Sequence, residues 1–377
     1  MYQANRSKAA TDFPIPDYDL FDIGAFYFAK KTFGKVDISG GIRLDRRNIN
    51  WADFYVGTDA QTGFGKQVNA AVSGANLQFP SFSKNYYGVS GSLGLTYNIS
   101  EQLLIKANIA RGYRAPNITE IGSNGLDPGA HIVYLGNRTF KPEFNLQEDI
   151  GLIAYLKDAD ISLELFNNNI QNYIYQSRLT DANGNPVVIV PGNLTYQYQQ
   201  SKARLYGAEV AANLHPAAIK WLTFNNSMAY VVGLNQNKEL LAKQGNKAKY
   251  LPFIPPLQIR SELKATAQHA IGFLSKPYVK IDAAIFADQN KFYGLDDTET
   301  FTKGYTLING GIGSTIVNRK DKTLFDVFIQ VDNIFNKAYQ SNLNRLKYFE
   351  YYTASPNGRS GIYNMGRNMS FKVIIPI

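Results

Sequence analysis

Residues 87–97 read Tyr87-Gly-Val-Ser-Gly-Ser-Leu-Gly-Leu-Thr-Tyr97, and this stretch decides the fold. Nearly every second side chain is apolar, and the side chains between them are small or polar. The apolar set is Tyr87, Val89, Leu93, Leu95 and Tyr97. A repeat of two residues is the pattern of a β-strand whose two faces meet different surroundings. The stretch therefore predicts a long strand with one apolar face.

The same alternation recurs along the chain, most clearly in residues 36–45, 257–264 and 325–332. It also ends the sequence, where we expect Phe371, Val373 and Ile375 on one face and Lys372 on the other. About thirteen strands are expected, at residues 20–30, 35–45, 86–98, 103–112, 148–157, 160–176, 196–214, 220–233, 257–267, 277–287, 304–316, 323–333 and 366–377. The chain is thus expected to be all-β and antiparallel.

A soluble sandwich would show the same alternation, so the connections between strands decide the architecture. Tight turns are expected at 33–35, 99–102, 157–160, 215–218 and 318–321. Long polar loops are expected between them, at 46–85, 113–147, 179–195, 234–255, 288–302 and 336–364. Short turns on one rim and long loops on the other are typical of an outer-membrane β-barrel.

The composition agrees with a transmembrane β-barrel. Mean hydropathy is −0.25 over 377 residues, and no stretch approaches the ~18 consecutive apolar residues that a spanning helix requires. The chain has 25 Tyr, 23 Phe and 31 Gly, a mixture that favours strands and turns. A barrel keeps mean hydropathy low because only every second residue faces lipid.

Several functions are disfavoured by what the sequence contains. There is no Cys, and the three His residues lie far apart, so we expect no disulfide, metal site or other cofactor. The formal charge of +9 is scattered rather than gathered in runs, which argues against nucleic acid as a partner. Neighbouring carboxylates at 148–149 and 296–297 are expected to be solvated and structural, because an acid catalyst needs a desolvated pocket. We therefore expect no enzyme.

Two features suggest that residues 1–377 form one incomplete domain. An all-antiparallel bacterial barrel uses an even number of strands, and thirteen is odd. Met1 is not followed by a secretion leader, which an outer-membrane protein requires. We expect that an upstream part belongs to the whole protein.

Several segments, taken in order, resemble TonB-dependent outer-membrane receptors, particularly those of Bacteroidota-like bacteria. Residues 331–340, Val-Asp-Asn-Ile-Phe-Asn-Lys-Ala-Tyr-Gln, are similar to the family's N-L-F-D-K-x-Y signature. Residues 110–117, Ala-Arg-Gly-Tyr-Arg-Ala-Pro-Asn, resemble its F-R-A-P-N segment. The pair formed by 141–143 and Glu148 resembles L-K-P-E followed by E-x-G. The resemblance covers residues 105–377 and implies the C-terminal thirteen strands of a 22-stranded barrel, with the family's plug domain absent.

The resemblance implies an outer-membrane receptor that imports a scarce nutrient, most commonly a ferric siderophore, energised through the TonB complex by way of the plug. Its partners would be outer-membrane lipid, the TonB complex and a small molecule such as an iron chelate. The alternatives are a glycan or cobalamin importer of the same family, a passive porin or adhesin barrel, and a soluble β-rich lectin or hydrolase.

The expected ligand contacts are Arg111, Arg114, Tyr348, Tyr351 and Tyr352. Arg43, Arg46 and Arg47 are also expected near the outer strand ends, where a positive mouth would attract an anionic chelate. Arg offers a planar charged fork for oxygen ligands, and Tyr offers rigid surface for stacking. As alternatives, the aromatic residues would belong to the interfacial girdle, and Arg111 would pair with a lumenal carboxylate such as Glu148.

Overall fold

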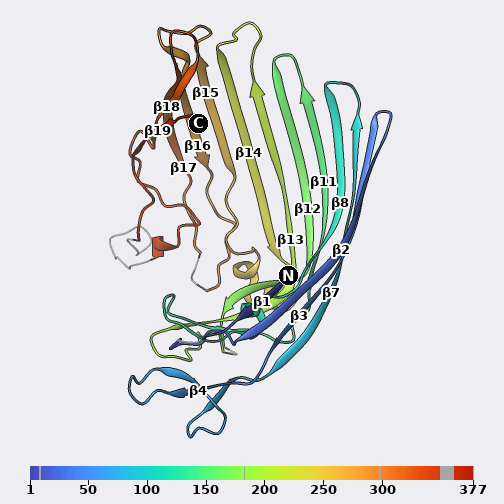
Figure 1. Ribbon diagram of the computed structural model, residues 1–377, viewed down its shortest axis with the longest axis vertical. Helices are drawn as coiled ribbons and strands as arrows, with labels where there is room; N and C mark the ends of the chain where they lie inside the picture. Colours follow the sequence, from blue (N-terminus) through green and yellow to red (C-terminus); the bar gives the residue numbers. More distant parts are fainter. Residues whose placement is uncertain (8–9, 182, 297–298, 349–360, 377) are drawn as a thin grey trace.

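Long strands follow one another along the chain, and each pairs with its neighbours in one antiparallel sheet (Figure 1). The computed structural model describes residues 1–7, 10–181, 183–296, 299–348 and 361–376. The long strands of this part are β2 (Tyr18–Phe33), β3 (Val36–Trp51), β7 (Phe82–Asn98), β8 (Leu103–Arg114), β11 (Glu143–Tyr155), β12 (Ala159–Arg178), β13 (Leu194–Leu214), β14 (Leu222–Asn235), β15 (Gln258–Thr266), β16 (Leu274–Phe286), β17 (Tyr305–Val317), β18 (Thr323–Asp332) and β19 (Asn368–Ile374). They pair in that order, and the short β1 (Tyr2–Asn5) pairs with β2.

Each expected strand overlaps one of these long strands, so the all-β antiparallel prediction is confirmed. The observed strands differ from the expected ones at the ends nearest the long loops. β3 continues to Trp51 and β7 begins at Phe82, so the loop expected at 46–85 is shorter. β11 begins at Glu143, five residues before the expected start. These ends are rich in Asn, Arg and Glu, which interrupt the apolar alternation but do not interrupt the backbone ladder.

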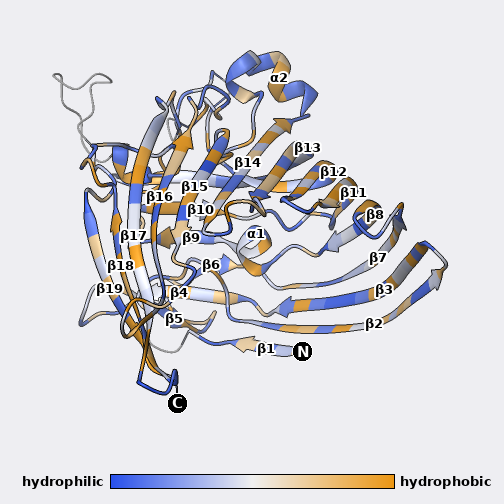
Figure 2. Ribbon diagram, turned by 90° about the horizontal axis from the view of Figure 1, so that it is seen from above, coloured by the Kyte–Doolittle hydropathy of each residue, from blue (hydrophilic) through white to orange (hydrophobic). Residues whose placement is uncertain are grey.

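The register sorts the side chains into two faces. Ile42 and Leu44 of β3 lie opposite Gly91 and Val89 of β7, and both apolar residues are more than half exposed. In β19, Phe371 pairs with Ile329 while Lys372 pairs with Phe328 on the other face. Figure 2 shows the strands arranged as an arc from β2 to β19 around an interior that holds α1, β9 and β10. The exposed apolar face therefore points outward, as required of a wall that meets lipid.

Short turns and long loops occupy opposite rims (Figure 1). Tight connections join β2 to β3, β7 to β8, β11 to β12, β13 to β14, β15 to β16 and β17 to β18. The other connections are long and meet at the lower rim of Figure 1, as expected. In the described part of the chain, no helix is both long and apolar enough to cross a membrane.

The long loops carry short elements that the alternation did not predict. They are β4 (Phe54–Thr58), β5 (Gly65–Val68), β6 (Asn76–Phe79), β9 (Asn124–Asp127), β10 (Ile132–Leu135), α1 (Ile118–Gly122), α2 (Lys238–Gln244), η1 (Gly245–Ala248) and η2 (Arg345–Tyr348). Ile118 and Ile121 of α1 pack with Ile49, Trp51 and Tyr86 in a buried cluster. This cluster fixes the loop layer against the inner side of β3 and β7.

Candidate functional site

A charged cleft lies on the inner wall where β2, β3 and β8 approach the long-loop rim. It encloses about 430 Å³ and is lined by Asp22, Arg43, Asp45, Arg46, Arg47, Ser90, Tyr113, Arg114 and Ala115. Arg47 donates to both carboxylate oxygens of Asp22 at 2.8 Å, and Arg43 pairs with Asp45 at 2.6 Å. Most of the charged side chains that line this cleft are therefore already paired with a side chain of opposite charge.

Arg114 joins three elements through two ion pairs. Its guanidinium binds Glu120 of α1 at 2.8 Å and also Glu143 at the start of β11. Glu120 is buried and completes a capping box with Asn117, whose side-chain oxygen accepts from the Glu120 N–H at 3.0 Å. Arg114 thus anchors α1 to the wall.

Arg111 lies at a fork in the sheet. The pairing of β7 with β8 ends at Gly91 and Arg111, and just beyond this point the Arg111 guanidinium donates a hydrogen bond to the backbone carbonyl of Val89. It also lies 4.0 Å from the centre of the Phe144 ring. The expected alternative of an ion pair with Glu148 is wrong, because Glu148 accepts a hydrogen bond from Asn167 and forms no ion pair with Arg111.

Gly88 explains why β7 and β8 separate at this point. A side chain on Gly88 would meet the ring of Tyr113 at 2.1 Å, so the glycine leaves room for Tyr113 over β7. The Tyr113 and Tyr86 hydroxyls are both buried, and neither has a partner among the described residues. Tyr113 lines the charged cleft, so its hydroxyl is the one that a polar ligand or water in the cleft could pair with, whereas Tyr86 belongs to the buried cluster behind it.

A second cavity in the loop layer is lined mainly by aromatic side chains. It encloses about 510 Å³ between the outer ends of β12 and β13, β10 and the loops at 252–253, 293–296 and 345. Its tyrosines are Tyr134, Tyr173, Tyr175, Tyr196, Tyr198 and Tyr293. We call it the tyrosine cavity.

Three features suit the tyrosine cavity to a polar aromatic or chelating ligand. The Tyr293 side chain is 1% exposed, and its hydroxyl has no partner among the described residues. Arg345 lies 4.8 Å from the centre of the Phe253 ring, beside the cavity. Tyr173 and Tyr175 stack with their rings 6.0 Å apart. Rigid rings, an orphan hydroxyl and a cation converge from separate segments, as in many ligand sites.

A buried carboxylate organises the loop beside the tyrosine cavity. Glu299 accepts from the backbone N–H of Phe253 and, at 3.4 Å, from that of Tyr293. Burial raises the pKa of Glu299, and these hydrogen bonds oppose the rise. Burial likewise raises the pKa of the Tyr134 and Tyr293 phenols, so both remain protonated donors at neutral pH.

The sequence prediction missed the tyrosine cavity. Of the expected ligand contacts, Arg114 lies in the charged cleft and Arg111 at the fork. Tyr348 ends η2, while Tyr351 and Tyr352 lie outside the described residues. A usable signal was present in residues 173–176 and 195–198, where tyrosines recur every second residue on two adjacent strands.

The comparisons with known proteins agree with this architecture. The family model for the TonB dependent receptor-like β-barrel matches residues 2–334. The chain belongs to the TonB-dependent receptor β-barrel family. The chain is therefore assigned to the outer membrane of Gram-negative bacteria, in a family whose members are receptors and transporters and not enzymes.

Individual relatives are distant and longer. The probable TonB-dependent siderophore receptor PirA of Acinetobacter baumannii is 23% identical over 294 residues, which cover 72% of this chain and 37% of PirA. The TonB-dependent heme receptor A of Haemophilus influenzae is 24% identical, with 84% of this chain and 41% of that protein covered. The solved copper transporter OprC matches with a TM-score of 0.69 and 19% identity, over 96% of this chain and 49% of its own. The chain thus spans less than half the length of each of these proteins.

Proposed function

We propose that the chain is the C-terminal part of the barrel of a TonB-dependent importer of a ferric siderophore. Residues 1–377 would form one incomplete domain of a 22-stranded barrel. The plug, and with it the contact to TonB, would be supplied by sequence outside this chain. Three facts support the proposal. The chain belongs to the TonB-dependent receptor β-barrel family, it spans less than half the length of the relatives it matches, and one of those relatives is a probable siderophore receptor.

The tyrosine cavity is the observation that supports an iron chelate as the ligand. An iron chelate presents oxygen atoms and, in catecholates, flat rings. Phenol hydroxyls held protonated can donate to those oxygens, and stacked rings can face the flat groups. Arg345 adds a permanent positive charge beside the cavity.

Binding of a ferric-siderophore panel to the complete receptor tests this assignment. Tyr293→Phe removes one orphan hydroxyl and no described hydrogen bond, so the fold should tolerate it. We expect the affinity for the bound chelate to fall about five- to tenfold, as for the loss of one buried hydrogen bond. Arg345→Gln should weaken anionic chelates more than neutral ones. Unchanged affinity in both variants would remove the cavity from the site.

Arg111, Arg114, Tyr348, Tyr351 and Tyr352 form a second candidate set for contact with the same ligand. An Arg111→Ala/Arg114→Ala variant and a triple Tyr→Ala variant test it in the same panel. We expect the arginine variant to lose stability as well as affinity, because Arg114 already holds two carboxylates. Loss of stability with unchanged affinity would assign Arg114 to structure alone.

Heme is the second candidate cargo, because a relative that covers 84% of the chain is a heme receptor. Heme is also flat and carries carboxylates, so the same cavity suits it. Including heme, cobalamin and a neutral oligosaccharide in the panel separates the classes. Tight binding of an oligosaccharide without siderophore binding would move the protein to the glycan importers. Uptake independent of TonB would favour a passive barrel.

A further inference from the structure

Buried polar side chains from two outer loops hold the backbone of a third. Glu299, in the loop between β16 and β17, is buried and accepts from the backbone N–H of Phe253. Gln289 of the same loop is also buried, and its side-chain amide donates to the backbone carbonyl of Ile254 at 2.5 Å. Asn342, in the loop between β18 and β19, donates to the same carbonyl at 3.0 Å. We call Glu299, Gln289 and Asn342 the backbone clamp.

The backbone held by the clamp is strained. Phe253 follows Pro252 in a turn, and its φ of 61° lies in the left-handed region. A bulky side chain rarely adopts this conformation, and turns that require it normally place Gly or Asn there. Such a residue keeps its conformation only when the surrounding structure enforces it. The hydrogen bonds of the backbone clamp supply that constraint.

The strained residue belongs to the loop wall of the tyrosine cavity, which consists of Pro252, Phe253 and Tyr293. The Arg345 guanidinium lies 4.8 Å from the centre of the Phe253 ring. While one carboxylate oxygen of Glu299 accepts from Phe253, the other accepts from the Tyr293 backbone N–H at 3.4 Å. A single buried carboxylate therefore fixes both aromatic residues of the loop wall.

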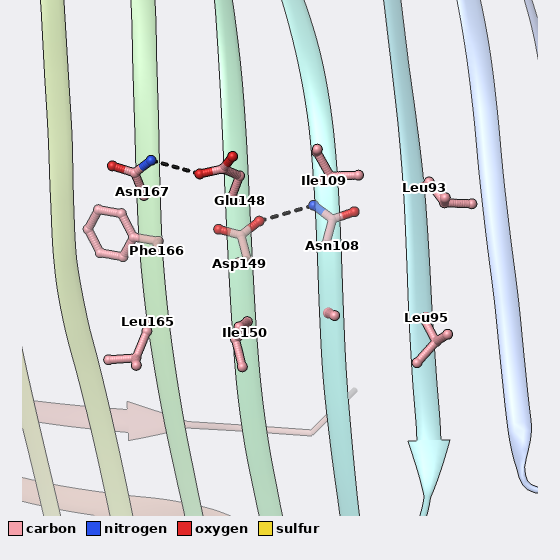
Figure 3. Close-up of a pocket in the computed structure, with 11 residues that line it drawn as sticks. Leu93, Leu95, Asn108, Ile109, Glu148, Asp149, Ile150, Leu165, Phe166 and Asn167 are labelled. Atoms are coloured by element: carbon pink, nitrogen blue, oxygen red, sulfur yellow. Dashed lines mark hydrogen bonds between the residues drawn. The ribbon is translucent and has the colours of Figure 1, made fainter.

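A β-bulge in β12 places two tyrosines in the strand wall of the same cavity. Below the bulge, Asn167 lies on the face from which it donates to Glu148 of β11 at 2.8 Å (Figure 3). Around Asn172, whose φ is 57°, the register of β12 with β13 shifts by one residue. Tyr173 and Tyr175 consequently lie on the opposite face from Asn167 and line the cavity. Re-aiming side chains in this way is a common use of a bulge.

We infer that the backbone clamp positions the loop wall for a flat aromatic ligand, with Glu299 as the principal positioning residue, an inference that rests on the proposed function of the tyrosine cavity. Pairing of β12 with β13 fixes the strand wall, and the clamp fixes the loop wall. The space between the two walls therefore keeps a constant width. Rings on both walls can pack against a flat aromatic group, and a preorganised site loses little conformational entropy when it binds one. A chelate without rings lacks that packing.

Hydrogen exchange of the complete receptor without ligand tests the clamp itself. Glu299→Gln keeps one acceptor oxygen but replaces the other with an NH₂ group, which cannot accept. We expect the amides of residues 249–254 and 290–296 to exchange about tenfold faster in this variant. Glu148→Gln, which alters a hydrogen-bonded carboxylate far from the cavity, is the matched control and should leave these rates within about twofold. Unchanged exchange in Glu299→Gln would overturn the inference.

Binding of a ferric tris-catecholate, heme and ferric citrate to the complete receptor tests the ligand class. We expect wild type to bind a flat-ring probe, and Glu299→Gln to weaken that binding about five- to tenfold. A receptor that binds only ferric citrate would overturn the inference and leave siderophore import in place. The same holds if Tyr293→Phe and Arg345→Gln weaken binding while Glu299→Gln does not. Unchanged affinity in all three variants would overturn the proposed site, and the inference with it.

Phe253→Gly separates positioning from a general loss of stability. Glycine adopts the left-handed conformation without strain, so the turn no longer depends on Glu299. Phe253→Gly should weaken binding by itself, because the ring is lost. In that background, however, Glu299→Gln should lower affinity by only about a further twofold. An equal loss from Glu299→Gln in wild type and in Phe253→Gly would overturn the positioning role.

Discussion

Arg114 forms ion pairs with the carboxylates of Glu120 and Glu143, which are both largely buried. Arg114→Gln would leave Glu120 buried beside a neutral partner. We expect a loss of about 1–3 kcal/mol in the free energy of unfolding, less than for a fully buried pair because the Arg114 side chain is 43% exposed. Urea unfolding of the complete receptor in detergent measures this loss. Arg319→Gln, on an exposed tight turn, is the matched control and should change stability by less than about 0.5 kcal/mol.

A double-mutant cycle identifies the cause of that loss. If Glu120 is the partner that matters, Glu120→Gln should recover much of the penalty when combined with Arg114→Gln. Strictly additive losses would contradict the ion-pair explanation.

The sequence alone predicted Arg114 as a ligand contact, because an arginine at an outer strand end is compatible both with ligand binding and with a structural ion pair. Its partners lie 6 and 29 residues away and are brought together only by α1 and the β8–β11 register.

At the scale of the strand, the sequence was highly informative. Period-two alternation located the long strands, and the faces assigned to residues 36–45, 87–97 and 371–373 agree with the register. The short strands β4, β5, β6, β9 and β10 were not predicted, because four or five residues in a polar loop show no usable period. β10 is fixed instead by parallel pairing with β13, about sixty residues away. The tyrosine cavity was missed for a different reason: its tyrosines do recur every second residue on β12 and β13, but its other walls come from distant loop segments that the alternation does not bring together.

The facing of β19 can be tested directly. Phe371 and Val373 point outward with Ile329 and Val327, whereas Lys372 lies on the inner face. Phe371→Arg or Val373→Arg should destabilise the complete barrel by up to about 2–4 kcal/mol, with the larger effect nearer the middle of the bilayer. Lys372→Ala should have little effect. Heat-modifiable migration after a urea series measures all three variants. The reverse order would mean that the register is wrong by one residue.

At the scale of the whole molecule, the described strands form an open sheet rather than a closed ring. β19 pairs with β18 and β1 pairs with β2, and in the described part of the chain these two edges do not pair with each other. Each edge leaves a row of backbone N–H and C=O groups without a strand partner. Lipid cannot satisfy such groups, and each costs several kcal/mol in hydrocarbon. A stable wall in the membrane therefore requires pairing partners for both edges, which the remaining strands of the proposed 22-stranded barrel would supply.

We accordingly expect the 377-residue chain, exported alone to the outer membrane, to fail to form a stable barrel. It should show no heat-modifiable migration and should be degraded, because its two edges remain open. The complete receptor, carrying the same residues together with the remaining strands, is the control and should be heat-modifiable. Co-production of the chain with the missing strands as a separate polypeptide should restore the shift, since strand pairing does not require a continuous backbone. A heat-modifiable, ligand-transporting product from the chain alone would show that these strands close by themselves.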